Sequence, residues 1–271
     1  MIFAIIAVLV LPPLIFLYLV LPGRAKKEKK ERFYGKSMAH RGLYEDDQSV
    51  PENSLSAFYL AVKNGYGIEL DVQLSADGRV VVFHDDSLNR ACGVDKRVDE
   101  LDYDDLKKLN LFGTDEHIPL FYEVLRSIGE NTPLIVELKT GKRNKELCKK
   151  TYELLSAYNG TYCIESFDPF IVKWFRFHAP HIMRGQLTQT PDEFVKAKTK
   201  KAVSFILGNI LFDFLTRPHF IAHRIGRRTF AVKVAEAAGA MKVSWTVRDK
   251  KDERNSDVII FEHYRPDISF K

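Results

Sequence analysis

Short runs of β-branched and aromatic residues alternate with stretches of helical periodicity from about Lys36 to the end of the chain. Alternation of this kind is typical of a parallel sheet whose strands are joined by helical crossovers. Eight predicted strands in a span of about 235 residues fit a (β/α)8 barrel of the TIM type. The predicted strands cover residues 37–39, 67–72, 134–138, 162–166, 183–187, 220–223, 243–247 and 257–262. The predicted helices cover residues 54–64, 103–110, 120–127, 144–158, 169–177, a segment within 191–215, and 229–238.

One further strand-like run, residues 80–84, does not fit the barrel. It follows Val72 after only seven residues, which include the hairpin turn signal Asp77-Gly78. Neighbouring parallel strands need a crossover of about a dozen residues or more. The sequence therefore predicts an antiparallel hairpin that projects from the second strand and brings His84 back to the end of that strand.

The first 22 residues form an uninterrupted apolar run without a charged side chain. A membrane-spanning helix needs about 20 such residues, although Pro12 and Pro13 would kink it. A cleaved signal peptide is the alternative, and it requires basic residues before the apolar run and small residues at the cleavage site. The chain has neither, because no Lys or Arg precedes the run and Pro22-Gly23 ends it. The sequence therefore predicts an uncleaved transmembrane anchor over residues 1–23.

The charge of the chain is concentrated next to this run. Of the formal net charge of +5, residues 24–32 contribute +4, with six Lys or Arg against two Glu. The remaining residues are close to neutral, which excludes a broad basic surface for DNA or RNA. Lys and Arg directly after an anchor predict a cytoplasmic C-terminal side and an attraction to anionic lipid. We expect a basic juxtamembrane linker over residues 24–35 and one domain over residues 36–271.

Composition and cysteine content agree with a folded protein in a reducing compartment. The 271 residues are 45% hydrophobic and 28% charged, ordinary values that exclude disordered and collagen-like chains. Cys92, Cys148 and Cys163 are odd in number and lack metal-ligand spacing, so they predict neither a disulfide framework nor a metal site. The predicted location is a membrane crossed once, with the domain on its cytoplasmic side.

Carboxylates gather where the predicted strands end, which is the functional end of a barrel of this type. Residues i and i+2 of a strand point to the same face, so Glu69 and Asp71 project together, as do Glu137 and Lys139. Three inward carboxylates offer the hard oxygen ligands that Mg²⁺ or Ca²⁺ prefers. Without a cation such a cluster would repel itself and raise its own pKa values.

Histidines and cations accompany these carboxylates. His40 and Arg41 end the first strand, and the hairpin returns with His84. The two imidazoles could act as general acid and general base near neutral pH. Arg41 and Lys139 supply fixed positive charge for a phosphate. Together with a metal, these groups suit the hydrolysis of a phosphodiester.

The order of the motifs is more specific than any one of them. In chain order they are His40-Arg41-Gly42, Pro51-Glu52-Asn53-Ser54 with Ala57-Phe58, Glu69-Leu70-Asp71-Val72-Gln73, Asp77-Gly78, His84-Asp85 with Leu88 and Arg90, Glu137-Leu138-Lys139, Ser166-Phe167, Trp245-Thr246-Val247 and Asp257-Val258-Ile259-Ile260. This series resembles the signature of the glycerophosphodiester phosphodiesterases. The resemblance extends over nearly everything after the basic segment.

The resemblance implies a distorted (β/α)8 barrel and a role for each motif. It implies that the enzyme cleaves a glycerophosphodiester to glycerol phosphate and an alcohol, as part of lipid metabolism. Attack by water and attack by a substrate hydroxyl, which gives a cyclic phosphate, both remain open. The implied roles are acid/base catalysis for His40 and His84, divalent-metal binding for Glu69, Asp71 and Glu137, and phosphate binding for Arg41 and Lys139.

Three further residues have two interpretations each. Glu52 and Asn53 open the first helix of the barrel, where they either cap the helix or contact the substrate. Trp245 either lines the glycerol or alcohol site or packs in the core.

Two segments set this chain apart from the family pattern. The family usually ends its last strand with Thr-Asp, and here Phe261-Glu262 stand there, which puts substrate contacts at that point in doubt. Residues 202–215 are apolar over most of a helical circumference. This helix either contacts a membrane or an acyl chain, or is buried against the barrel or a dimer partner.

These observations leave three hypotheses of function. The first is hydrolysis of soluble glycerophosphodiesters, and the second is a lysophospholipase D that acts on lysophospholipids of the membrane. The third is an inactive barrel that binds lipid or serves as a scaffold. Membrane lipid is an expected partner in each case, and the oligomeric state is not predicted.

Overall fold

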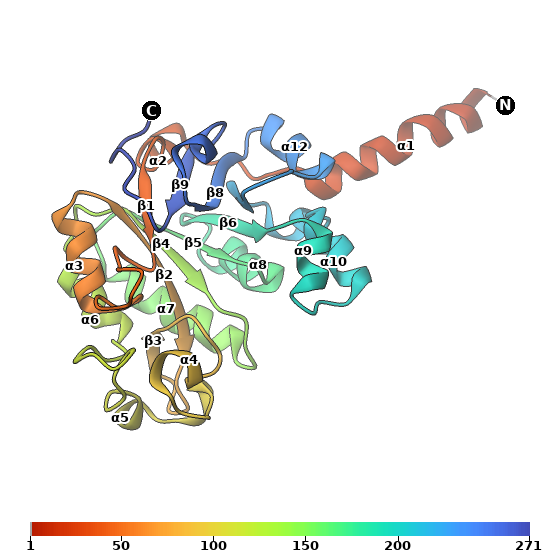
Figure 1. Ribbon diagram of the computed structural model, residues 1–271. Coiled ribbons are helices and arrows are strands. Elements are labelled where there is room, and N and C mark those ends of the chain that lie inside the picture. The colour runs from red at the N-terminus through yellow and green to blue at the C-terminus, as the bar shows by residue number, and fades with distance from the viewer. Residues whose placement is uncertain (1) are drawn as a thin grey trace.

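A computed structural model describes residues 2–271, with side chains from residue 9 onward (Figure 1). In this part of the chain nine strands form one sheet, and all except β3 are parallel neighbours. The sheet closes because β1 pairs with both β2 and β9, which confirms the predicted barrel. The eight predicted strands lie within two residues of their expected bounds, at β1 (Ser37–His40), β2 (Gly67–Leu74), β4 (Leu134–Leu138), β5 (Tyr162–Ser166), β6 (Met183–Thr188), β7 (Phe220–Arg224), β8 (Met241–Val247) and β9 (Val258–Phe261).

The predicted hairpin is also present. Strand β3 (Val80–Val82) pairs antiparallel with the end of β2, with Val72 opposite Val82. An insertion follows, made of α4 (Asn89–Cys92), a 3₁₀ turn (Val98–Glu100) and α5 (Tyr103–Leu106). This insertion has its own buried apolar cluster, which includes Phe83 beside His84. The hairpin is therefore held in place by packing.

Helices cover the outside of the barrel. They are α3 (Leu55–Lys63), α6 (Phe121–Ile128), α7 (Asn144–Ser156), α8 (Pro169–His178), α9 (Pro191–Lys196), α10 (Lys201–Gly208), α11 (Asp213–Thr216) and α12 (Phe230–Ala237), with a 3₁₀ turn at Lys250–Glu253. Ser54 and Thr229 cap α3 and α12 through their side-chain oxygens. The apolar segment expected within 191–215 is three helices, because Lys198 and Ile210 have positive φ. Gly208 ends α10 against Pro191, where a Cβ would collide with the proline ring.

The interior of the barrel changes character along its length. At the amino ends of the strands it is apolar, with Met38, Cys163, Phe220 and Met241 packed together. Nearer the carboxyl ends acidic side chains replace these residues, beginning with Glu69 and its neighbours. The apolar half therefore lies beneath a polar mouth.

The N-terminal segment packs on the outside of the barrel. Helix α1 (Ile2–Val20) ends at Val20, which is buried between α12 and Ile221. Helix α2 (Lys27–Glu31), within the basic segment, lies at the amino ends of the strands, where Lys30 Nζ donates to Gly239 O over 2.6 Å.

The predicted anchor over residues 1–23 lies partly outside the described side chains. Among the residues that the structure does describe, none of the helices combines the length and the hydropathy that a membrane crossing requires.

Candidate active site

The mouth of the barrel holds a cavity of about 430 Å³ at the carboxyl ends of the strands. Polar side chains from β1, β2, β4 and the hairpin line one half. Aromatic and aliphatic side chains from β5 to β9 line much of the other half. The structure brings the sequence-predicted His40, Arg41, Glu69, His84, Glu137, Lys139 and Trp245 to this one cavity.

Three buried carboxylates form the base of the polar half. Glu69, Asp71 and Glu137 each offer an oxygen, and these oxygens all lie within 4.8 Å of one another. Burial raises the pKa of Glu69 well above its usual range, and the charges of Asp71 and Glu137 raise it further. Burial also raises the pKa of Glu137, although Lys139 opposes the shift. Three carboxylates whose negative charges repel one another in this way fit a divalent metal ion, which would bind their oxygens and offset the repulsion.

Lys139 and Arg41 lie against the same carboxylates. Lys139 Nζ is 3.0 Å from Glu137 Oε1 and 3.3 Å from Asp71 Oδ1, and Arg41 Nε is 3.5 Å from Asp71 Oδ2. Burial acts to raise the pKa of Asp71, but Lys139, His84 and Arg41 outweigh it and hold that pKa well below its usual range. Asp71 is therefore ionised, and both cations are held at the cavity wall, where a phosphate oxygen could reach them.

A strained turn aims Arg41 into the mouth. Arg41 and Gly42 both have positive φ, at 56° and 81°. A Cβ at Gly42 would lie 2.9 Å from Ala57, so the turn requires glycine. The backbone N–H of Arg41 donates to Glu69 Oε2 over 3.1 Å, which joins the turn to the carboxylate cluster.

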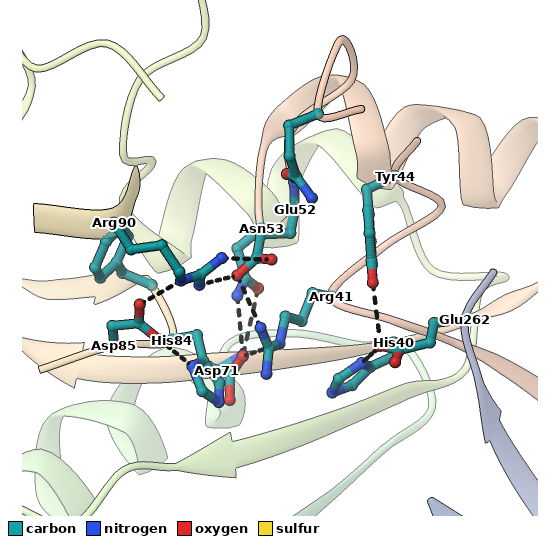
Figure 2. Close-up of polar contacts among 12 residues, drawn as sticks. His40, Arg41, Tyr44, Glu52, Asn53, Asp71, His84, Asp85, Arg90 and Glu262 are labelled. Atoms are coloured by element: carbon teal, nitrogen blue, oxygen red, sulfur yellow. Dashed lines mark hydrogen bonds and ion pairs between the residues drawn. The ribbon is translucent and has the colours of Figure 1, made fainter. Parts of the chain in front are cut away.

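His40 is held by a carboxylate that follows the last strand. Its Nδ1 lies 2.6 Å from Glu262 Oε2 (Figure 2). Its Nε2 lies 4.0 Å from Glu69 Oε2. Tyr44 and Arg248 also donate to Glu262. Burial lowers the pKa of His40, and Arg41 lowers it further, while Glu262 opposes both. The lowered pKa favours the neutral imidazole, in which Nδ1–H is donated to Glu262 and Nε2 is the acceptor nitrogen.

His84 has the same arrangement on the other side of Arg41 (Figure 2). Its Nδ1 lies 2.5 Å from Asp85 Oδ1, and Asp85 accepts from Arg90 over 2.6 Å. Arg90 continues to Glu52 over 2.6 Å, and Glu52 accepts from Arg41 over 2.8 Å. This series of ion pairs connects the segment that begins at His84 to Arg41 at the end of β1. The position of the His84 imidazole therefore depends on residues on the opposite side of the mouth.

Glu52 and Asn53 support other site residues. Glu52 is engaged by two guanidinium groups, and Asn53 Nδ2 donates to Asp71 Oδ2 over 2.9 Å. The cavity wall is formed by other side chains, so these contacts favour positioning over the predicted substrate contact. Trp245 does line the cavity, where its ring packs edge-on against Phe167 at 5.5 Å.

Several side chains in the mouth are absent from the predicted set. Glu165 lies beside Glu137 on the next strand, lines the cavity, and is 1% exposed. Its Oε2 has no hydrogen-bond partner among the described residues. The alternation Cys163, Glu165, Phe167 along an inward-facing strand is a signal that could have found it. Glu262 stands where this chain departs from the family pattern, and its contact with His40 requires the closed barrel.

We expect Glu262→Gln to lower kcat/KM about 100-fold, because the residue fixes the tautomer of His40. The Glu262 carboxylate opposes the lowering of the His40 pKa, so its removal lowers that pKa further. The limb of the pH–rate profile that His40 controls should therefore move to lower pH. Tyr44→Phe is the control, since it removes one neutral hydrogen bond to the same carboxylate and should change kcat/KM less than about tenfold. An unchanged pH profile in Glu262→Gln would contradict this role.

Comparison with known proteins gives a consistent result. The model of the glycerophosphoryl diester phosphodiesterase family matches residues 40–262. A glycerophosphodiester phosphodiesterase of Caldanaerobacter subterraneus subsp. tengcongensis is 36% identical over 163 residues, which are 56% of this chain and 66% of that protein. The human lysophospholipase D GDPD1 is 37% identical over 157 residues, which are 53% of this chain and 48% of that protein. The chain thus matches about half to two thirds of the length of these relatives.

Solved structures share the fold. A phosphodiesterase of Oleispira antarctica, solved in complex with the product sn-glycerol-3-phosphate, superposes with a TM-score of 0.69 at 23% identity. The match covers 86% of this chain and 94% of that one. A glycerophosphodiester phosphodiesterase of Thermotoga maritima gives a TM-score of 0.62 at 23% identity, over 83% and 93% of the two chains.

Proposed function

Since this chain belongs to the glycerophosphoryl diester phosphodiesterase family, we propose that it hydrolyses glycerophosphodiesters to glycerol phosphate and an alcohol. The observation that carries the proposal is the pairing of two carboxylate-backed imidazoles with a buried carboxylate trio in one cavity. The trio fits a divalent ion, and we propose Mg²⁺ or Ca²⁺ held by Glu69, Asp71 and Glu137. When bound, such an ion withdraws charge from the phosphate oxygens and offsets the negative charge of the trio.

The protein's own groups supply the remaining chemistry. Arg41 and Lys139 bind the non-bridging phosphate oxygens and stabilise the charge that grows on them. One imidazole accepts a proton at Nε2 from the attacking oxygen, which belongs to water or to a substrate hydroxyl. The other imidazole, protonated at Nε2, gives that proton to the departing alkoxide. Glu262 and Asp85 keep each Nε2 directed at the cavity.

A second candidate keeps this chemistry and changes the substrate to a lysophospholipid. It is favoured by exposed apolar side chains on α1, α10 and α12, which a soluble diester would not need. Similarity to a lysophospholipase D supports it as well. The location proposed with it is a membrane crossed once by residues 1–23, with the barrel on the cytoplasmic side and membrane lipid as a partner. An inactive scaffold is disfavoured because all seven predicted catalytic positions hold competent side chains.

The test is a comparison of glycerophosphocholine and lysophosphatidylcholine as substrates of the full chain. We expect release of choline or of glycerol phosphate in the presence of Mg²⁺ or Ca²⁺, loss of turnover in EDTA, and recovery when excess metal is added. Preference for lysophosphatidylcholine would select the second candidate. Activity that persists in EDTA would remove the metal from the proposal, and absence of cleavage with either ion would favour a scaffold.

A further inference from the structure

Large apolar side chains lie exposed beside the mouth of the barrel. Phe205 of α10 and Phe230 of α12 are 59% and 73% exposed. Helix α12 follows β7 and begins beyond its carboxyl end, on the side where the cavity opens. Helix α10 ends on the same side, because Thr188 at the end of β6 donates to Leu207 O and Thr229 donates to Gly208 O. Ile225, which lines the cavity, precedes Phe230 by only five residues. The exposed apolar surface is therefore an extension of the rim of the active site.

Helix α1 continues this surface. The ring of Phe16 stacks on Phe230 with centroids 5.8 Å apart, and Tyr18 packs against Phe214 at 5.9 Å. An apolar groove of about 700 Å³ runs between α1 and α10, with Ile15 and Phe205 among its lining residues. We call the exposed members of this surface the apolar face: Leu14, Ile15 and Tyr18 of α1, Val203 and Phe205 of α10, and Phe230 of α12.

The direction of α1 places the apolar face at the mouth end of the barrel. At its base, the N–H of Gly23 donates to Pro218 O over 2.8 Å, just before β7 begins. Seven residues earlier, Phe16 contacts Phe230 at the start of α12, beyond the carboxyl end of β7. Followed back from Val20 to its N-terminus, α1 thus extends from the amino ends of the strands towards the mouth. Figure 1 shows it continuing past α12, on the side to which β6 points.

The charges around the apolar face are predominantly positive. Lys198, Lys200 and Lys201 are exposed at the start of α10, and Arg227 is exposed just before Phe230. In the described part of the chain none of the three lysines forms an ion pair. A ring of basic side chains around aromatic and aliphatic ones is typical of a surface that binds anionic lipid. A symmetric contact with a second copy would instead bring these lysines together, which is unfavourable.

We propose that the apolar face docks on a lipid bilayer and holds the mouth of the barrel at the membrane–water interface. The diester head of a single-chain glycerophospholipid lies at that depth, so the site could take it directly from the bilayer. This consequence for the substrate rests on the proposed function, whereas the docking itself does not.

The first experiment measures contact with lipid directly. In the full chain with Cys92→Ser, Phe205→Cys is labelled with an environment-sensitive NBD probe, since the native Cys148 and Cys163 are buried. Vesicles of phosphatidylcholine with a minority of phosphatidylglycerol should shift its emission to the blue, and more strongly than vesicles of phosphatidylcholine alone. The control probe at Tyr59→Cys lies on α3, across the barrel from α10, and should not shift (Figure 1). Equal emission at position 205 with and without vesicles would overturn the proposal.

The second experiment separates docking from catalysis. The double variant Phe205→Glu/Phe230→Glu should lower turnover of lysophosphatidylcholine in vesicles about tenfold or more. It should leave turnover of soluble glycerophosphocholine unchanged, which also shows that the variant folds. Tyr59→Glu should change neither. Equal turnover of vesicle substrate in the double variant and the unsubstituted protein would overturn the proposal. It would also be overturned if the two substitutions converted a dimer into a monomer on size exclusion, because the apolar face would then be a contact between two copies. If neither substrate is cleaved but the probe shifts, the proposed function fails and the docking surface stands.

Discussion

Glu69→Gln should reduce turnover of a glycerophosphodiester on the order of 1,000-fold and at the same time stabilise the metal-free protein. The loss of turnover follows from removing one charged ligand of the trio. The gain in stability follows because Glu69 is buried, and its neighbouring carboxylates raise its pKa. Removal of a buried, poorly compensated carboxylate should raise the free energy of unfolding by about 1–3 kcal/mol at pH 8 in EDTA. Urea unfolding in EDTA and in Mg²⁺ measures both effects.

The stabilisation should depend on pH in a defined direction. A carboxyl whose pKa is raised on folding takes up a proton more readily in the folded state than in the unfolded state. The contribution of protonated Glu69 to the free energy of unfolding is therefore complete below the ordinary glutamate pKa, and it is lost as the pH rises through the raised pKa of the folded state. The metal-free protein should lose stability over this range more steeply than Glu69→Gln, and the two should converge at low pH.

Glu165→Gln is the matched control for the metal effect. Glu165 is as deeply buried and its pKa is also raised well above the usual range, by burial first and then by Glu137. It lies outside the group of oxygens within 4.8 Å. Its variant should gain stability in EDTA and still be stabilised further by Mg²⁺, whereas Glu69→Gln should lose most of that response. An equal response to Mg²⁺ in Glu69→Gln and the unsubstituted protein would show that the ion binds elsewhere.

The barrel was predictable from sequence because its signals are local. Several strands are short runs rich in β-branched residues, such as Leu134–Leu138 and Val258–Phe261, and the Asp77-Gly78 turn marks the hairpin. The grouping of the candidate site residues was predictable because they lie at the ends of those strands, where a barrel brings them together. The i, i+2 rule and the order of the strands are enough to place Glu69, Asp71 and Glu137 together.

The features of the fold and of the site that the sequence does not predict depend on contacts between residues far apart in the chain. Residues 191–215 break into three helices at Lys198 and Ile210, which have positive φ, and periodicity does not reveal these breaks. The partner of His40 comes from 222 residues further along the chain, and becomes its neighbour only when β9 pairs with β1. The ion-pair chain from Asp85 through Arg90 to Glu52 likewise needs the insertion to fold back on the mouth. Glu52, Asp85 and Arg90 stand in motifs as the reacting groups do, but the contacts among them are not encoded locally.

His40→Ala and His84→Ala should each lower kcat for glycerophosphocholine by about 100-fold to 10,000-fold, because each removes one proton transfer. A diester with a 4-nitrophenolate leaving group needs no proton on departure. The variant that lacks the general acid should therefore hydrolyse it nearly as fast as the unsubstituted protein, while the variant that lacks the base should remain slow. Rates on the two substrates identify the acid and the base without any assumption about which is which.

The backing carboxylates provide the control for this assignment. Asp85→Asn should follow the pattern of His84→Ala, and Glu262→Gln that of His40→Ala, because each carboxylate acts through its own imidazole. Adding Asp85→Asn to His84→Ala should change kcat little, since residues that act as a unit are not additive. If both histidine variants were equally slow on the activated diester, a single imidazole would not be serving as the acid. If both histidine variants hydrolysed the activated diester as fast as the unsubstituted protein, neither imidazole would be the base, and the two-imidazole mechanism would have to be abandoned.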